Sequence, residues 1–162
     1  MHKDIRAELL EIEKLARSEC YHEALRRADA LAGSHPREPD IWATRGYVNG
    51  RHGDLPAAIS DLSICIDLRR SEPDDFFTRG RFLFRAGRYD EAASDFTRVI
   101  QLCDSYNSDY YRQPAYFFRA DAYVRLGQYE KARADCGRVA DRGQVWTDRL
   151  RTIDQILSEC QR

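Results

Sequence analysis

A repeat of 34 residues constrains this chain more than any single motif. Six positions of the segment that begins at Trp42 recur 34 residues later, and they recur once more after a slightly longer step. The three sets are Trp42, Arg45, Gly46, Gly53, Ala58 and Asp61; Phe76, Arg79, Gly80, Gly87, Ala92 and Asp95; and Tyr116, Arg119, Ala120, Gly127, Ala132 and Asp135. A period of this length is typical of stacked helical hairpins. The sequence therefore predicts an all-α repeat fold.

Each repeat is predicted to contain two helices. Gly53, Gly87 and Gly127 follow the first helix of a pair, where glycine commonly ends a helix in the left-handed conformation. The apolar residues of the second helices recur at helical spacing, which places them in one stripe. Pro39 and Pro73 indicate the junctions between hairpins, because proline cannot continue a helix.

Both ends of the chain depart from the repeat. The segment before Pro39 keeps its register, but Glu8 replaces the aromatic residue and Ile12 replaces the glycine or alanine. Near the other end, Trp146, Leu150, Ile153, Leu157 and Cys160 recur at the spacing of one amphipathic helix, which would cover the last hairpin. We expect one domain over 1–162, with repeats at about 5–38, 39–72, 73–106 and 113–143 and a capping helix at about 145–161.

The charge balance and the cysteines limit the classes of partner. The chain has 26 basic and 27 acidic side chains, which gives no general attraction to nucleic acid or to an anionic membrane. The N-terminal residues are too charged for a signal peptide, and no apolar run is long enough to span a membrane. The five cysteines lack CxxC spacing, so we expect reduced, mostly buried thiols and a cytoplasmic location.

The repeat resembles the tetratricopeptide repeat (TPR) family over roughly residues 5 to 140. The resemblance rests on an aromatic residue four positions before Gly46 or Gly80, and on the G-x-Y segments Gly87-Arg88-Tyr89 and Gly127-Gln128-Tyr129. It implies a small, stand-alone, bacterial-type member of the family. It also implies a right-handed superhelix of about four helix-turn-helix hairpins, whose concave groove binds a protein or peptide.

Opposite charges recur within the hairpins, where the family often has leucine at the first position. One spacing separates the two members of every pair: Arg45 with Asp61, Arg79 with Asp95, Arg119 with Asp135 and, with the charges exchanged, Glu11 with Arg27. We interpret them as salt bridges across each hairpin. Such pairs fix the register more than they add stability, because desolvation offsets much of the attraction.

No pattern in the chain favours catalysis. The four histidines have no cysteine or carboxylate partner at a metal-ligand spacing such as HExxH. The sequence also contains no P-loop, no dinucleotide fingerprint and no G-x-S-x-G motif. We therefore predict no catalytic, cofactor or metal residue, and a protein that is not an enzyme.

Binding residues are expected on the face of each first helix that looks away from the hairpin core. The predicted groove residues are Tyr47, Arg51, Phe77, Arg81, Phe84, Arg85, Phe117, Asp121 and Arg125. Arg17, Arg51, Arg85 and Arg125 hold one equivalent site near a helix C-terminus, where a basic residue also complements the helix dipole. Exposed aromatic residues beside arginine are typical of interfaces.

A six-residue insertion between Val99 and Tyr116 gives a second candidate contact. It brings Tyr106, Tyr110 and Tyr111 close together in a segment rich in Tyr, Ser and Asn, which is an adaptable contact surface. The alternative is a longer linker whose tyrosines pack on neighbouring helices. Both interpretations stay open at the level of the sequence.

We expect a protein-interaction module that acts as an adaptor, chaperone or inhibitor on a partner segment with acidic and apolar residues. The alternatives are an immunity protein that neutralises a cognate bacterial toxin and a self-assembling homo-oligomer. Some TPR domains hold a partner's C-terminal carboxylate with lysines and asparagines of the groove. The three lysines of this chain, Lys3, Lys14 and Lys131, do not fall on the predicted face.

Overall fold

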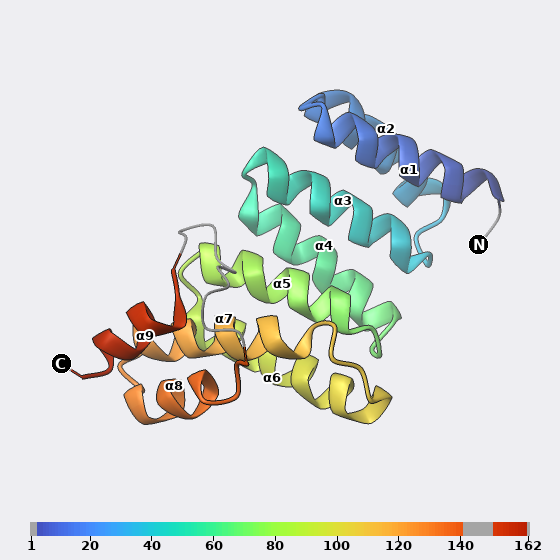
Figure 1. Ribbon diagram of the computed structural model, residues 1–162. Coiled ribbons are helices and arrows are strands. Elements are labelled where there is room, and N and C mark those ends of the chain that lie inside the picture. The colour runs from blue at the N-terminus through green and yellow to red at the C-terminus, as the bar shows by residue number, and fades with distance from the viewer. Residues whose placement is uncertain (1–2, 141–150, 162) are drawn as a thin grey trace. The chain divides into compact units, whose positions relative to one another are not determined.

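A computed structural model describes residues 3–140 and 151–161, and within these ranges it contains nine α-helices and no strand (Figure 1). The helices are α1 (Lys3–Arg17), α2 (Tyr21–Ser34), α3 (Pro39–His52), α4 (Leu55–Leu68), α5 (Pro73–Arg85), α6 (Tyr89–Tyr106), α7 (Arg112–Arg125), α8 (Tyr129–Cys136) and α9 (Ile153–Glu159). The predicted all-α hairpin fold is confirmed.

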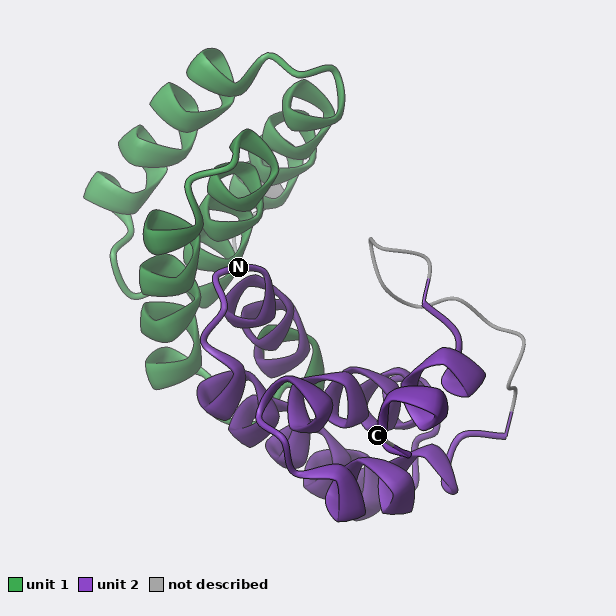
Figure 2. Ribbon diagram, turned by 90° about the vertical axis from the view of Figure 1, so that its left-hand side faces the viewer, with its two compact units in different colours: residues 1–75 green, residues 76–162 purple. Residues whose placement is uncertain are grey.

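The chain divides into two compact units, Met1–Asp75 and Phe76–Arg162, whereas the sequence led us to expect a single domain (Figure 2). In the first unit, α3 packs against α4 and α2, and α1 packs against α2 and α3. In the second unit, α7 packs against α6 and α8, and α9 covers both α7 and α8.

The helices begin and end where the turn residues predict. Gly53, Gly87 and Gly127 have φ angles of 100°, 78° and 70°, in the left-handed region. The first hairpin has no glycine at this turn. Glu19 occupies the position equivalent to Gly53 and adopts a φ of 62°, which an L-residue other than glycine reaches at a cost of about 1–2 kcal/mol.

Two positions of the repeat, one in each helix of a hairpin, carry residues of different size. The residues at these positions are Ile12 and Ala28, Gly46 and Leu62, Gly80 and Phe96, and Ala120 and Cys136. Gly46 lies against Leu62, and Gly80 lies against Phe96. A Cβ atom built on Gly80 would lie only 2.8 Å from Cε1 of Phe96, so the ring occupies the space that the glycine leaves. The size of the second residue therefore decides which residue the first helix can carry.

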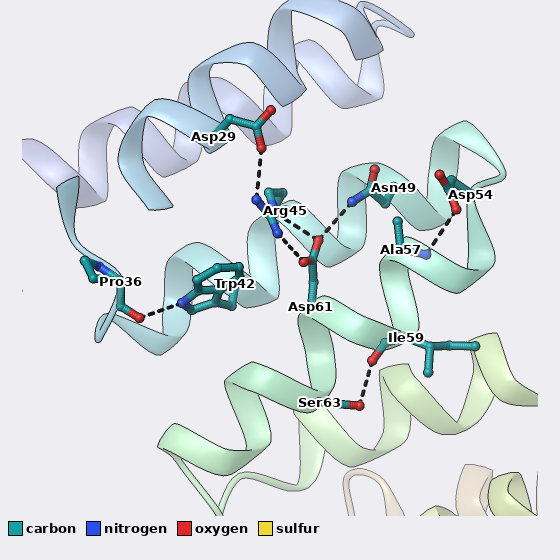
Figure 3. A network of polar contacts seen from close by, with 10 residues as sticks. All are labelled: Asp29, Pro36, Trp42, Arg45, Asn49, Asp54, Ala57, Ile59, Asp61 and Ser63. Carbon is teal, nitrogen blue, oxygen red and sulfur yellow. Dashed lines mark hydrogen bonds and ion pairs between the residues drawn. The ribbon is translucent and has the colours of Figure 1, made fainter. Parts of the chain in front are cut away.

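The three predicted arginine–aspartate bridges are present, and each guanidinium contacts both carboxylate oxygens. The Nη2–Oδ1 distances are 2.6 Å for Arg45–Asp61, 2.7 Å for Arg79–Asp95 and 2.7 Å for Arg119–Asp135. Figure 3 shows the first of these, where Asn49 also donates to Asp61 at 2.9 Å and Arg45 reaches Asp29 of α2 at 3.0 Å.

Each of these arginines also lies over the aromatic residue that begins the repeat motif. The Cζ atom of Arg45 is 4.6 Å from the ring centroid of Trp42, and the corresponding distances are 5.8 Å for Arg79 over Phe76 and 5.5 Å for Arg119 over Tyr116. Burial raises the pKa of Asp95 in spite of the neighbouring Arg79. This direction agrees with a bridge that fixes register more than it adds stability.

For the first hairpin, the prediction named the wrong acidic partner of Arg27. Arg27 contacts Glu8, with an Nε–Oε1 distance of 2.6 Å, whereas Glu11 pairs with Lys14 at 3.5 Å. Glu8 and Glu11 lie one helical turn apart on the same face, and Glu8 occupies the aromatic position of the later repeats. The charges are thus exchanged as predicted, but the acidic partner is Glu8, which lies one helical turn before Glu11.

The helix at the C-terminal end is shorter than predicted in the part of the chain that the structure describes. It begins at Ile153, after a capping box in which the Thr152 side chain accepts from the N–H of Gln155. Trp146 and Leu150, which the prediction placed in this helix, lie outside the described residues. Ile153 and Ile156 are fully buried, as expected for a helix that covers the last hairpin.

Candidate partner-binding site

An aromatic pocket of about 350 Å³ lies within the second unit. Helix α5 contributes Phe77 and Arg81, which are one turn apart on one face. The inserted segment contributes Tyr110 and Tyr111. Helix α7 contributes Pro114 and, one turn later, Phe118, so that the lining is complete with Phe77, Arg81, Tyr110, Tyr111, Pro114 and Phe118.

The inserted segment is tied to the helices on both of its sides. Helix α6 ends at Asn107, whose φ of 49° is left-handed and turns the chain. Arg112 then contacts the carboxylates of Asp104, at 3.2 Å, and of Asp109, and donates to the carbonyl oxygen of Cys103 at 3.3 Å. These contacts hold the two tyrosines at the entrance of α7.

The pocket walls are aromatic rings that touch one another. The ring centroid of Phe77 is 5.1 Å from that of Tyr111 and 5.7 Å from that of Phe118, and the second pair meets edge to face. Tyr110 meets Tyr111 edge to face at 4.7 Å. Phe118 stacks on Phe96 at 5.4 Å, so the pocket wall continues directly into the hairpin core.

Arg81 is the one charged residue among the six that line the pocket. Its Cζ atom lies 5.7 Å from the ring centroid of Phe118, which is the distance of a cation–π contact. The half-buried guanidinium is therefore the one charged group at the edge of an otherwise apolar lining.

The structure brings together four of the predicted residues: Phe77 and Arg81 from the groove set, and Tyr110 and Tyr111 from the insertion. Tyr110 is 78% exposed, whereas Phe77 is 9% exposed and forms the floor. Tyr106 is 55% exposed but does not line the pocket. Among the tyrosines of the insertion, the structure thus separates two pocket residues from one that lies outside.

Other predicted groove residues of the second unit lie outside the pocket. Phe84 is half-buried, with its ring centroid 5.2 Å from Tyr89 and 6.2 Å from Phe118. Arg85 is exposed and lies over the ring of Phe82 at 5.8 Å. Both side chains border the aromatic cluster without lining the cavity.

The prediction that Phe117 and Asp121 line an open groove is wrong. Phe117 is 0% and Asp121 1% exposed, and α9 packs against α7. Arg151 binds the Asp121 carboxylate, and Arg125 approaches it at 3.5 Å. Burial raises the pKa of Asp121 in spite of these two cations.

The predicted groove residues of the first unit form a separate local cluster. Tyr47 is half-buried, and the exposed Arg51 lies 5.9 Å from its ring centroid. Arg17, at the equivalent site of α1, pairs with Glu13 at 2.8 Å. These arginines stand in the last turn of their helices and have partners nearby, which favours the helix-end interpretation of the site.

Sequence reasoning missed Pro114 and Phe118. Their counterparts in the third repeat are Asp74 and Thr78, so both positions change from polar to apolar in the fourth repeat. This break in the repeat is the signal that would have identified them. It follows the insertion directly, and the two departures together build one wall of the pocket.

The described residues hold no group of three or more His, Cys, Asp or Glu side chains placed to bind a metal ion. None of the helices between residues 3 and 140 or 151 and 161 is both long and apolar enough to cross a membrane. The thiol of Cys20 is exposed, and the other four cysteines are buried and in no disulfide, which agrees with the prediction of mostly buried thiols.

Solved structures of low sequence identity share this fold. MamA (residues 41 to the end) from Desulfovibrio magneticus RS-1 is 19% identical, with a TM-score of 0.72 over 85% of this chain and 75% of that chain. The Yersinia enterocolitica type III secretion translocator chaperone SycD is 17% identical, with a TM-score of 0.66 over 80% and 89%. The first TPR domain of Spaghetti (RPAP3), solved with the HSP90 peptide SRMEEVD, is 21% identical, with a TM-score of 0.66 over 75% and 91%.

A comparison of the sequence with curated proteins finds no match. The family model of the tetratricopeptide repeat matches residues 12–73 and 77–144, which is most of the chain and reaches into every hairpin described above. The chain therefore belongs to the tetratricopeptide repeat family.

Proposed function

We propose that this protein is a non-catalytic interaction module and that the aromatic pocket of the second unit binds a protein or peptide partner. The observation that carries the proposal is a cavity of about 350 Å³ whose lining is aromatic residues, one proline and one arginine. Aromatic residues and arginine dominate the binding energy of protein interfaces. An adaptor, chaperone or inhibitor that works in the cytoplasm needs such a surface and no reacting group.

Two of the similar structures support this class of function. SycD is a translocator chaperone, and the RPAP3 domain was solved with an acidic peptide. None of the described residues that line the pocket is a lysine. We propose a partner segment with acidic and apolar residues, whose apolar side chains the aromatic rings of the pocket bind.

The test uses two variants that differ in one respect. Tyr110→Ala removes an exposed ring from the pocket, and Tyr106→Ala removes an exposed ring from the same segment but outside the pocket. Neither change opens a cavity in a core. Each variant and the unaltered chain serve as bait in extracts of the native host, and retained proteins are then purified and titrated by calorimetry.

The proposal predicts a partner that binds the unaltered chain and Tyr106→Ala equally and binds Tyr110→Ala about tenfold more weakly, as expected when an interface loses one aromatic anchor. A partner whose direct affinity is the same for all three proteins would place the interface elsewhere.

A further inference from the structure

We propose that His22 and His52 together bind a divalent transition-metal ion in the first unit. His22 lies in the first turn of α2, and His52 is the last residue of α3, which packs against α2. The centroids of the two rings are 6.1 Å apart, with an angle of 57° between the ring planes. The site does not depend on the proposed function, because the aromatic pocket belongs to the second unit.

The distance between the two rings fits one shared ion. A zinc ion lies about 2.0–2.1 Å from an imidazole nitrogen, so two rings that share the ion have centroids at most about 6.4 Å apart, and about 5.2 Å apart at a tetrahedral angle. The observed 6.1 Å falls within this limit. An approach of about 1 Å by rotation of the two side chains would give the tetrahedral arrangement.

Both rings are available to an ion. The two side chains are exposed, and neither ring makes a hydrogen bond or an ion pair with another residue that the structure describes. The ring of Tyr21 lies 5.2 Å from that of His52, centroid to centroid, and supports it on one side. The pair therefore combines nitrogen atoms that have no protein partner with room to adjust.

The donor atoms decide which ions the site prefers. The acids nearest in sequence are engaged elsewhere, since Glu23 accepts from Arg26 at 2.6 Å and the Asp54 side chain accepts from the N–H of Ala57 at 3.0 Å. Imidazole suits Zn²⁺, Ni²⁺ and Cu²⁺, whereas Mg²⁺ and Ca²⁺ are bound by oxygen ligands. We expect Cu²⁺ to bind most tightly of the three, and two protein ligands leave positions on the ion for water or for a donor of another molecule.

Local spacing in the sequence did not predict this pair. His22 belongs to the first hairpin and His52 to the second, so no motif within one segment contains both residues. The two positions meet because the end of α3 packs beside the beginning of α2.

The test is an NMR titration of the isotope-labelled full chain, without an affinity tag, with Zn²⁺ at about pH 8, because only neutral imidazole binds a metal ion. The ring signals of His22 and His52 should shift together along one binding curve. His35, whose Nδ1 atom lies 2.9 Å from Oγ of Ser34, should not respond, and Mg²⁺ should shift none of the three. With free Zn²⁺ at ten times its dissociation constant, the thermal midpoint should rise by about 3–6 °C, since the ion binds the folded chain.

Single substitutions assign the ligands. His22→Ala and His52→Ala should each weaken zinc binding at least about tenfold, because even the loss of a residue that only orients a ligand costs about 10–100-fold. His35→Ala is the matched control and should leave the affinity unchanged. Cys20→Ser, which removes the exposed thiol, and His2→Ala, at a residue outside the described range, should also bind zinc as the unaltered chain does.

Three results would overturn the proposal. The first is a response of one ring alone, two curves with different midpoints, or no shift at millimolar Zn²⁺. The second is weaker binding by Cys20→Ser or His2→Ala, which would assign the ion to other donors. The third is a zinc-induced dimer in sedimentation, which would mean that the ion joins two copies of the chain. None of these results bears on the aromatic pocket, where the affinity of Tyr110→Ala for a partner is the separate test.

Discussion

Replacing Gly80 by alanine tests the link between hairpin packing and the pocket. The new Cβ atom would lie 2.8, 3.1 and 3.2 Å from three ring carbons of Phe96. That ring is 0% exposed and is held by Phe77 at 5.9 Å and by Phe118 at 5.4 Å, so it cannot swing away freely. Overpacking of this kind costs about 1–3 kcal/mol, and the gain from placing alanine in a helix offsets about 0.5–1 kcal/mol. We expect a net loss of about 0–2.5 kcal/mol.

Gly33→Ala is the matched control, because no atom lies within 4 Å of its new Cβ. It should stabilise the protein by about 0.5–1 kcal/mol through helix propensity alone. Urea unfolding followed by circular dichroism measures both variants. A second change, Phe96→Leu, should recover part of the loss in Gly80→Ala, because Leu62 faces the glycine of the preceding hairpin. A Gly80→Ala protein as stable as Gly33→Ala would refute the packing argument.

The buried bridge, the left-handed turn and the buried thiols give three further predictions. Asp61→Ala leaves Arg45 and Asn49 without their buried acceptor and should lower the free energy of unfolding in urea by about 2–3 kcal/mol. Asp29→Ala, at a side chain that is 62% exposed, should lower it by less than about 1 kcal/mol. Equal losses in the two variants would contradict the role of the bridge. Glu19→Gly relieves a left-handed backbone and should raise the thermal midpoint by about 1–3 °C, and a lower midpoint would show that the turn is unstrained. Burial raises the pKa of Cys65 to about 12, so this thiol stays protonated near neutral pH. A thiol reagent at about pH 8 should therefore rapidly modify the exposed Cys20 alone, and rapid modification of a second cysteine would contradict this expectation.

The repeat made most of the fold predictable, because each hairpin meets the same packing requirement. The positive φ of Gly53 and the contact of Arg45 with Asp61 both follow from spacing alone. Spacing could not decide between Glu8 and Glu11 as the partner of Arg27, since both acids lie on one helix face a single turn apart. Glu8 stands at the position that an aromatic residue holds in the later repeats, and it is this acid that contacts Arg27.

The candidate site was less predictable, because it depends on segments outside the repeat. Phe117 and Asp121 are buried, and Asp121 is bound by Arg151, a residue next to α9 that has no counterpart in the other hairpins. The pocket itself needs the insertion to place Tyr111 against Phe77, two residues that are far apart in sequence. Repeat phase identifies the face of a helix, but it does not predict what a longer loop or a terminal segment brings to that face.

The most direct test of the partner site is the affinity of a purified natural partner for Tyr110→Ala and for Tyr106→Ala, measured by calorimetry against the unaltered chain. Both variants lose one exposed tyrosine of the same segment, and only Tyr110 lines the pocket. Our account predicts about tenfold weaker binding for Tyr110→Ala and unchanged binding for Tyr106→Ala. Equal dissociation constants for the two variants would contradict it.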